Sequence, residues 1–107
     1  MLITPTDVLQ DKTIDNYLGT VSSEVILGAN FVKDFFANVR DVLGGRSGSY
    51  EQVIAKAKEE ALHELTYRAQ KLGANAVIGM QYNFLTIGAG GSMLMVSLAG
   101  TAVKLKP

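Results

Sequence analysis

Residues 93–105 read Met-Leu-Met-Val-Ser-Leu-Ala-Gly-Thr-Ala-Val-Lys-Leu, and both alternating sets of positions in this run are largely apolar. A strand that is apolar on both faces is typical of the centre of a sheet covered on each side. The two sets are Met93, Met95, Ala99 and Val103, and Leu94, Val96, Leu98 and Ala102. We therefore expect a central strand here, with helices over one face and a second subunit over the other.

Two further long strands are expected on either side of this centre. Residues 76–86 alternate, and Gly88–Gly91 permits a hairpin into the central strand. The positions expected on one face are Ala76, Ile78, Met80, Tyr82 and Phe84. Residues 14–27 alternate clearly toward their end but loosely near Gly19, which indicates a bulge or a close backbone approach. Residues 2–4 predict a short additional strand.

Two helices are predicted between the outer strands. Asn30 is a suitable N-cap for a helix to Leu43, and Ser49 and Gln52 have the capping-box spacing for a second helix that ends at Gly73. The apolar stripe of the second helix is rich in alanine: Ile54, Ala57, Ala61, Leu65, Ala69 and Leu72. A right-handed crossover makes the outer strands parallel, so the central strand fits antiparallel between them. The expected fold is a two-layer α/β (α+β) domain.

The composition limits the classes of protein to be considered. The length of 107 residues fits one domain, and the ten basic and ten acidic residues give no basic footprint for nucleic acid. With no cysteine, no signal peptide and no apolar run near the roughly 20 residues of a membrane span, we expect a cytoplasmic, soluble protein. The hydrophobic fraction is 48%, and only 19% of the residues are charged. A small domain buries a smaller fraction of its surface than a large one, so this composition favours a homo-oligomer that covers the remaining apolar surface.

Five motifs extend over almost the whole chain. They are Ile26–Asn30, Arg40-Asp41, Gly44–Gly48 with Tyr50, Leu72–Gly79 and Gly100–Val103. Together they resemble the YbjQ-like family of small bacterial proteins. The resemblance implies a single domain over residues 1–107, with an antiparallel sheet and a subunit fold like that of dodecin. It also implies a homopentameric ring and, from the family's usual label, heavy-metal binding.

The loop from Gly44 to Tyr50 is the first candidate site. Its candidate ligand-binding residues are Gly44, Gly45, Arg46, Ser47 and Tyr50. Glycines allow unusual backbone angles, a helix N-terminus offers free N–H groups, and an arginine can clamp a phosphate or carboxylate. The loop lacks the Gly-Lys-Ser/Thr of a P-loop. The alternative interpretation is a hinge between two helices in which Arg46 pairs with an acid such as Asp41.

A second candidate is a metal site on the second helix, formed by Glu59, Glu60 and His63. A Glu-x-x-His pair can ligate a metal ion in carboxylate-bridged bundles, but such sites need further ligands that one chain does not supply. The alternative interpretation is a solvated helix face stabilised by Lys56–Glu60 and Glu64–Arg68 pairs. No metal ion is required by the sequence, and a metal cofactor is a hypothesis that rests on this cluster.

Catalytic chemistry is not indicated, because no Ser-His-Asp set or paired carboxylates stand in a motif context. Three functions therefore remain open. The first is a small-anion binding module with its site at subunit interfaces. The second is heavy-metal binding, and the third is a scaffold ring for a protein partner. The expected partner in each case is another copy of the chain, with no nucleic acid and no membrane.

Overall fold

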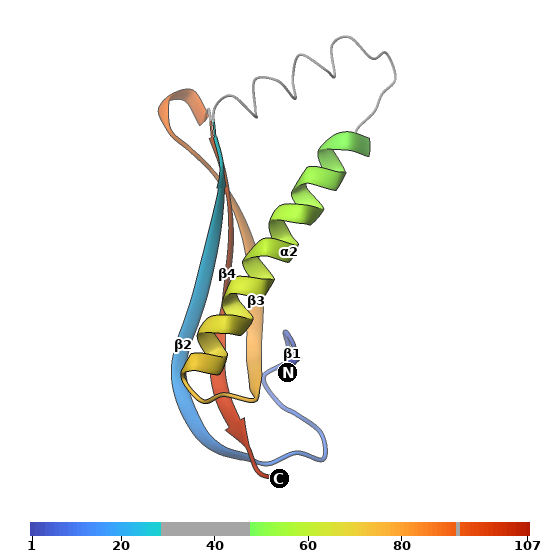
Figure 1. The fold of residues 1–107 in the computed structure, drawn as a ribbon, viewed down its shortest axis with the longest axis vertical. Helices are drawn as coiled ribbons and strands as arrows, with labels where there is room; N and C mark the ends of the chain where they lie inside the picture. The colour runs from blue at the N-terminus through green and yellow to red at the C-terminus, as the bar shows by residue number, and fades with distance from the viewer. Residues whose placement is uncertain (29–47, 92) are drawn as a thin grey trace.

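A four-stranded sheet with one helix across it forms the architecture of the computed structural model, which describes residues 1–28, 48–91 and 93–107 (Figure 1). The elements are β1 (Leu2–Ile3), β2 (Ile14–Leu27), α2 (Gly48–Lys71), β3 (Ala76–Ile87), a 3-10 turn η1 (Ala89–Gly91) and β4 (Met93–Leu105). The predicted helix at residues 30–43 lies outside the described residues. The α+β class predicted from the sequence is confirmed.

Strand β4 lies at the centre, as its two apolar faces predict. The sheet order is β1-β3-β4-β2, and β4 pairs antiparallel with both β2 and β3. Strands β2 and β3 therefore run in the same direction on either side of it. The short strand β1 adds to the outer edge of β3 in parallel register. Each of the four predicted strands is present, and each begins at the residue expected.

A bulge at Gly79 changes which side chains of β3 share a face. The register with β4 shifts between Ile78 and Gln81, and Gly79 has φ +62°. One extra residue reverses the alternation, so Val77 and Met80 both pack beneath α2 while Ile78 faces the opposite side. The prediction that Ala76, Ile78 and Met80 lie on one face is therefore wrong.

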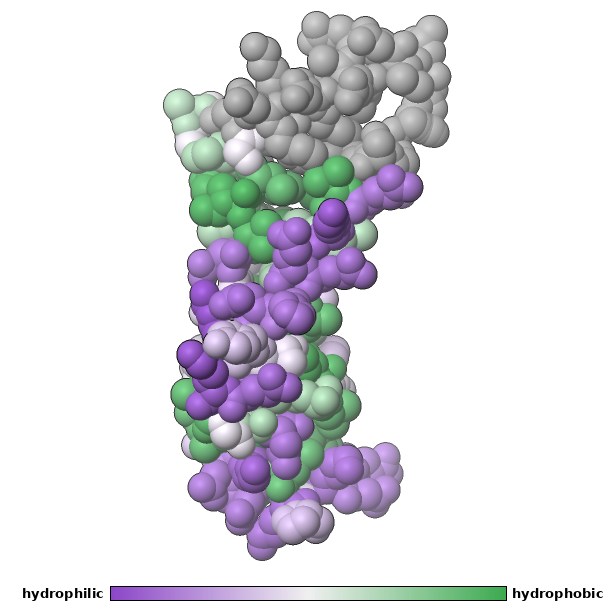
Figure 2. All heavy atoms as spheres, in the orientation of Figure 1, coloured by the Kyte–Doolittle hydropathy of each residue, from purple (hydrophilic) through white to green (hydrophobic). Residues whose placement is uncertain are grey.

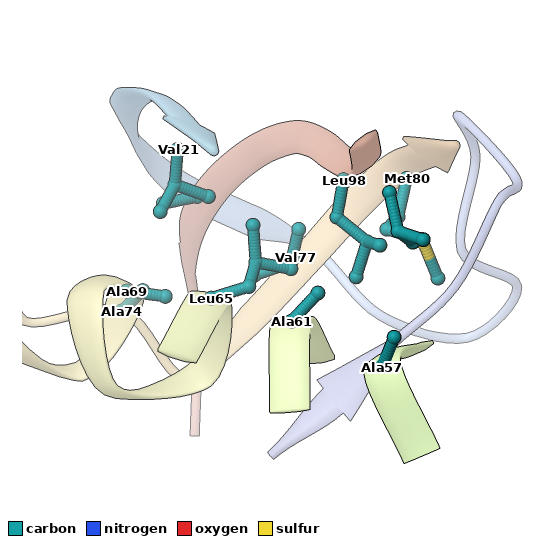
Figure 3. Close-up of a cluster of buried hydrophobic side chains, with 11 residues drawn as sticks. Val21, Ala57, Ala61, Leu65, Ala69, Ala74, Val77, Met80 and Leu98 are labelled. Carbon is teal, nitrogen blue, oxygen red and sulfur yellow. The ribbon is translucent and has the colours of Figure 1, made fainter. Parts of the chain in front are cut away.

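The main core lies between α2 and the sheet, as Figure 3 shows. Small residues on the helix bring its backbone close to the strands, and Leu65 is buried in the same cluster as Val21 and Val77. Its buried members are Val21, Ala57, Ala61, Leu65, Ala69, Ala74, Val77, Met80, Val96, Leu98 and Ala102. Leu72, predicted to continue the buried stripe, is 47% exposed because α2 ends at Lys71.

Two polar contacts hold α2 against β2. The hydroxyl of Ser23 is fully buried and donates a hydrogen bond to the carbonyl of Ala61. At the edge of the sheet, Arg68 donates from Nη1 to the carbonyl oxygen of Ser22 at 2.7 Å, and its Nε lies 3.1 Å from a carboxylate oxygen of Glu64. These contacts fix the helix where it crosses the strand, whereas its N-terminal half runs away from the sheet (Figure 1).

The second face of the sheet is covered at one end only. There the buried side chains of Ala76, Ile78, Val103 and Leu105 form a smaller cluster. Leu9 and Ile14 pack over this cluster, so the segment that precedes β2 closes this end. At this end the chain itself covers the second face, and the expected cover by another subunit stays a prediction for the rest of that face.

Candidate functional site

The loop proposed as a ligand site lies largely outside the described residues. Gly44, Gly45, Arg46 and Ser47 are not described, and Tyr50 belongs to the first turn of α2. The loop's role as an anion site or as a hinge therefore stays a prediction. The described helix α2 begins at Gly48, at the end where α2 stands away from the sheet (Figure 1).

The three residues of the predicted metal cluster share the exposed side of α2. Glu59, Glu60 and His63 are all solvent-exposed. Among the described residues, no group of three or more His, Cys, Asp or Glu side chains is placed to hold a metal ion. Any ion bound here would need ligands from elsewhere. On the same helix, the predicted Glu64–Arg68 ion pair is confirmed.

A small hollow opens between α2 and β2 where the two diverge. Its volume is about 80 Å³, and it is lined by Val25, Leu27, Val53, Lys56, Ala57 and Glu60. Four of these residues are apolar, while Lys56 and Glu60 are exposed to solvent. This volume holds only a few atoms, so the hollow suits one inserted side chain better than a metabolite.

The sheet has an uncovered area on its second face, at the end near the β3–β4 hairpin. Paired residues form rows across the three long strands. On this face, the two complete rows nearest the hairpin are Glu24–Ser97–Asn83 and Ile26–Met95–Leu85. Ile26 is 57% exposed and Leu85 50% exposed. Met93 and Met95 are only half-buried, although β4 is the central strand. Sequence reasoning expected an apolar face here but did not place its boundary.

Hydrophobic side chains also gather at this end on the helix side of the molecule, beyond the polar surface of α2 (Figure 2). Phe84 on β3 is 48% exposed. Its side chain alternates with that of Leu85, so apolar groups are exposed on both faces of the same strand end. Such a concentration in a small domain is typical of a surface that binds a partner.

No helix of the described ranges 1–28, 48–91 and 93–107 has both the length and the hydrophobicity to cross a bilayer. The described helix α2 instead has a mixed surface, with acidic Glu51 in its first turn and basic Arg68 and Lys71 in its last. That charge order complements the helix dipole.

Comparison with known proteins gives one family and one fold. Residues 1–106 match the model of a family described as "Putative heavy-metal-binding". A "UPF0145 protein" of Trichormus variabilis is 48% identical over 108 residues, which cover 99% of this chain and all of that protein. A crystal structure from Pediococcus pentosaceus, of a protein with unknown function in the DUF74 family, has a TM-score of 0.61 at 19% identity. The matched region covers 99% of this chain and 98% of that chain, and the likeness supports the fold described above.

Proposed function

The chain belongs to the YbjQ-like family whose description is "Putative heavy-metal-binding", and from this premise we propose that it is the subunit of a cytoplasmic, homopentameric binding module. The proposed ligand is a small anion held at the boundary between subunits. Arg46 would supply the charge, with the N–H groups of the Gly44–Ser47 loop and the start of α2 around it.

One observation carries the self-association: the uncovered end of the sheet. Ile26 and Leu85 lie in the same row on either side of Met95, and both are half or more exposed. Full burial of one large aliphatic side chain contributes about 1.5–3 kcal/mol, so covering these two half-exposed side chains would contribute roughly 2 kcal/mol per copy. This favourable term supports association of copies through this end.

Light scattering of the purified protein tests the assembly. A particle mass about five times the subunit mass of 11.5 kDa is expected at micromolar concentration. A mass of one subunit under those conditions would remove the subunit boundary and with it the proposed site.

Thermal unfolding with and without inorganic phosphate tests the anion site. Phosphate should raise the melting temperature of the native protein, and Arg46→Ala should abolish that rise. Lys106→Ala is the control, since it removes an exposed positive charge near the C-terminus. If Arg46→Ala instead dissociates the particle, Arg46 holds subunits together and the loop is a hinge rather than a ligand site.

Metal binding is the second candidate, and the family description favours it. Glu59, Glu60 and His63 are exposed on one helix face, so a second chain could complete their ligand set. Equilibrium dialysis against Zn²⁺ should show stoichiometric uptake that His63→Ala removes and Gln70→Ala, an exposed change on the same helix, leaves in place. Uptake that His63→Ala does not change would exclude this cluster. A pentamer that takes up neither phosphate nor metal would leave the scaffold role.

A further inference from the structure

We propose that copies of this chain join by extending the sheet, with the end of β2 in one copy pairing in parallel with the end of β3 in the next. The proposal rests on the self-association proposed above and specifies which strands meet. Three properties of the described residues support it. Some backbone N–H and C=O groups of β2 and β3 point out of the sheet, other parts of the two edges are blocked, and the unblocked stretches lie at matching positions along the two strands.

The direction of the backbone groups is fixed by bonds within the sheet. The carbonyl of Val103 accepts a bond from the amide of Asn75, so Val103 bonds toward β3. Backbone groups alternate along a strand, so Ala99 also bonds toward β3. Its partner Ser22 must then point its backbone groups away from the sheet, which is where Arg68 reaches the Ser22 carbonyl. By the same alternation, Glu24 and Ile26 present outward N–H and C=O groups.

The first half of the β2 edge is blocked. The register with β4 is irregular between Ile14 and Asn16 and again between Tyr17 and Gly19. Bulges of this kind twist an edge out of the plane in which another strand could pair. Beyond them, the Arg68 guanidinium donates a hydrogen bond to the carbonyl oxygen of Ser22, so this carbonyl is not free to pair with another strand. The regular part of the edge that remains is residues 24–27.

The outer edge of β3 is blocked over its first half as well. Strand β1 pairs with Ala76 and Val77, and the segment after β1 continues this cover. Its bonds run from the Thr4 amide to the Val77 carbonyl at 3.0 Å, from the Gly79 amide to the Thr6 carbonyl at 2.9 Å, and from the Met80 amide to the Thr4 carbonyl at 3.1 Å. Beyond this point the outward groups belong to Tyr82, Phe84 and Thr86, and no strand of the described chain pairs with them.

The two open stretches lie at the same level of the sheet. Ile26 is opposite Met95, and Met95 is opposite Leu85. Both stretches are the C-terminal ends of their strands, next to the β3–β4 hairpin (Figure 1). A sideways step across the sheet therefore brings residues 24–27 of one copy beside residues 82–87 of the next. Because β2 and β3 run in the same direction, this new pair is parallel.

The faces of the sheet match in this arrangement. In a parallel pair, a residue that bonds toward its neighbour lies level with one that bonds away, and their side chains share a face. Ile26 bonds outward and Leu85 bonds toward β4, and both side chains lie on the uncovered face. An antiparallel β2–β3 pair would put the uncovered face of one copy next to the helix face of the other. The parallel pair instead continues the apolar area from one copy into the next.

This pairing uses a different edge from each copy, so it cannot give a two-fold dimer, and repeated pairing gives a ring when the rotation from copy to copy closes. A two-fold dimer through β2 would pair four residues with four and leave the β3 edge open. In a ring, every copy has both edges paired. An open, regular and apolar edge is otherwise a template for aggregation, and closure removes it.

Disulfide trapping tests the proposal directly, because the chain has no cysteine of its own. Ile26→Cys is combined in one chain with Asn83→Cys, Leu85→Cys or Ile87→Cys, which allows for a stagger of two residues either way. Ile26 and Leu85 of one copy are separated by two strand spacings, about 9.5 Å, whereas a disulfide needs Cα atoms within about 7 Å. Any bond formed must therefore join two copies.

Mild oxidation should convert at least one of the three double variants into a ladder of covalent multimers on a non-reducing gel. Each single variant should give no more than a trace of dimer. Light scattering in reducing agent confirms that the variants assemble like the native protein. Native assembly with no ladder in any double variant would overturn the edge pairing while leaving self-association intact. Efficient dimers from Ile26→Cys alone would overturn it in favour of a two-fold, and a native monomer would overturn both proposals.

Discussion

The two ends of the sheet are built from the same three strands but differ in how they are covered. At the end near the chain termini, the second face is closed by Leu9 and Ile14, and β1 and the bulged part of β2 blunt the edges. At the end near the β3–β4 hairpin, Ile26 and Leu85 remain half or more exposed and both edges are regular. One end therefore stabilises the subunit, and the other has the properties of a surface for joining subunits.

The largest effect should come from Leu65, which is fully buried between α2 and the sheet. Leu65→Ala should lower the free energy of unfolding by about 3–5 kcal/mol, since it removes apolar contacts and leaves a cavity. Chemical denaturation measures this change. Ile26→Ala, at the uncovered end, is the contrast, and in the monomer it should cost less than about 1 kcal/mol. Equal losses from the two changes would contradict the division of the sheet.

Gly100 should give the next largest effect, because it faces the bulge in β3. A Cβ atom at this position would lie 2.7 Å from Cγ1 of Val77 and 3.1 Å from the carbonyl oxygen of Ile78. Gly100→Ala should destabilise the protein by about 1–3 kcal/mol through overpacking. Gly28→Ala is the matched control, since nothing lies within 4 Å of a Cβ there. Thermal unfolding of both variants tests this, and a neutral Gly100→Ala would show that β3 shifts freely.

Ser23 makes the buried polar contact between β2 and the middle of α2. Ser23→Ala removes a buried hydrogen bond to the Ala61 carbonyl and should cost about 1 kcal/mol. Its neighbour Ser22 is exposed, and Ser22→Ala should change stability by less than about 0.5 kcal/mol. Denaturant midpoints of the two variants give the comparison. A larger loss of stability from Ser22→Ala than from Ser23→Ala would mean that contacts at the sheet edge, and not the contact with α2, hold this part of β2 in place.

Arg68 should have the smallest effect on subunit stability. The Arg68 and Glu64 side chains are 49% and 48% exposed, so Arg68→Ala should cost no more than about 0.5–1 kcal/mol. The change uncovers the Ser22 carbonyl and lengthens the regular open edge, so higher-order association should increase. Light scattering over time measures it, with Lys71→Ala as a control on the same helix. Unchanged association would show that Arg68 does not limit pairing along β2.

Much of the fold can be predicted from the sequence. The two apolar faces of residues 93–105 place that strand at the centre, and the alanine spacing of the second helix identifies four residues that the structure buries: Ala57, Ala61, Leu65 and Ala69. The reversal of faces in β3 could not be predicted, because one bulge at Gly79 changes every later position. A single glycine in a strand is compatible with several local geometries.

The candidate site could be predicted only in part. Glu59, Glu60 and His63 share an exposed helix face as their spacing predicts, but a ligand set that spans two chains has no signal in the spacing of one. The open strand ends were missed for a similar reason. Which part of an edge is blocked depends on a contact such as Arg68 to Ser22, which joins residues 46 positions apart.

Hydrogen exchange at the backbone amides of Ile26 and Phe84 in the assembled protein tests most directly whether the open ends join copies. Within one copy these amides point outward and have no partner in the described chain, whereas the adjacent amides of Val25 and Leu85 bond within the sheet. Edge pairing predicts that the amides of Ile26 and Phe84 are protected nearly as strongly as those of Val25 and Leu85. Dilution to monomer should remove the protection of Ile26 and Phe84, so that these two amides exchange at the rate of solvent-exposed groups. Rapid exchange of both amides in a particle that light scattering shows to be assembled would contradict the account.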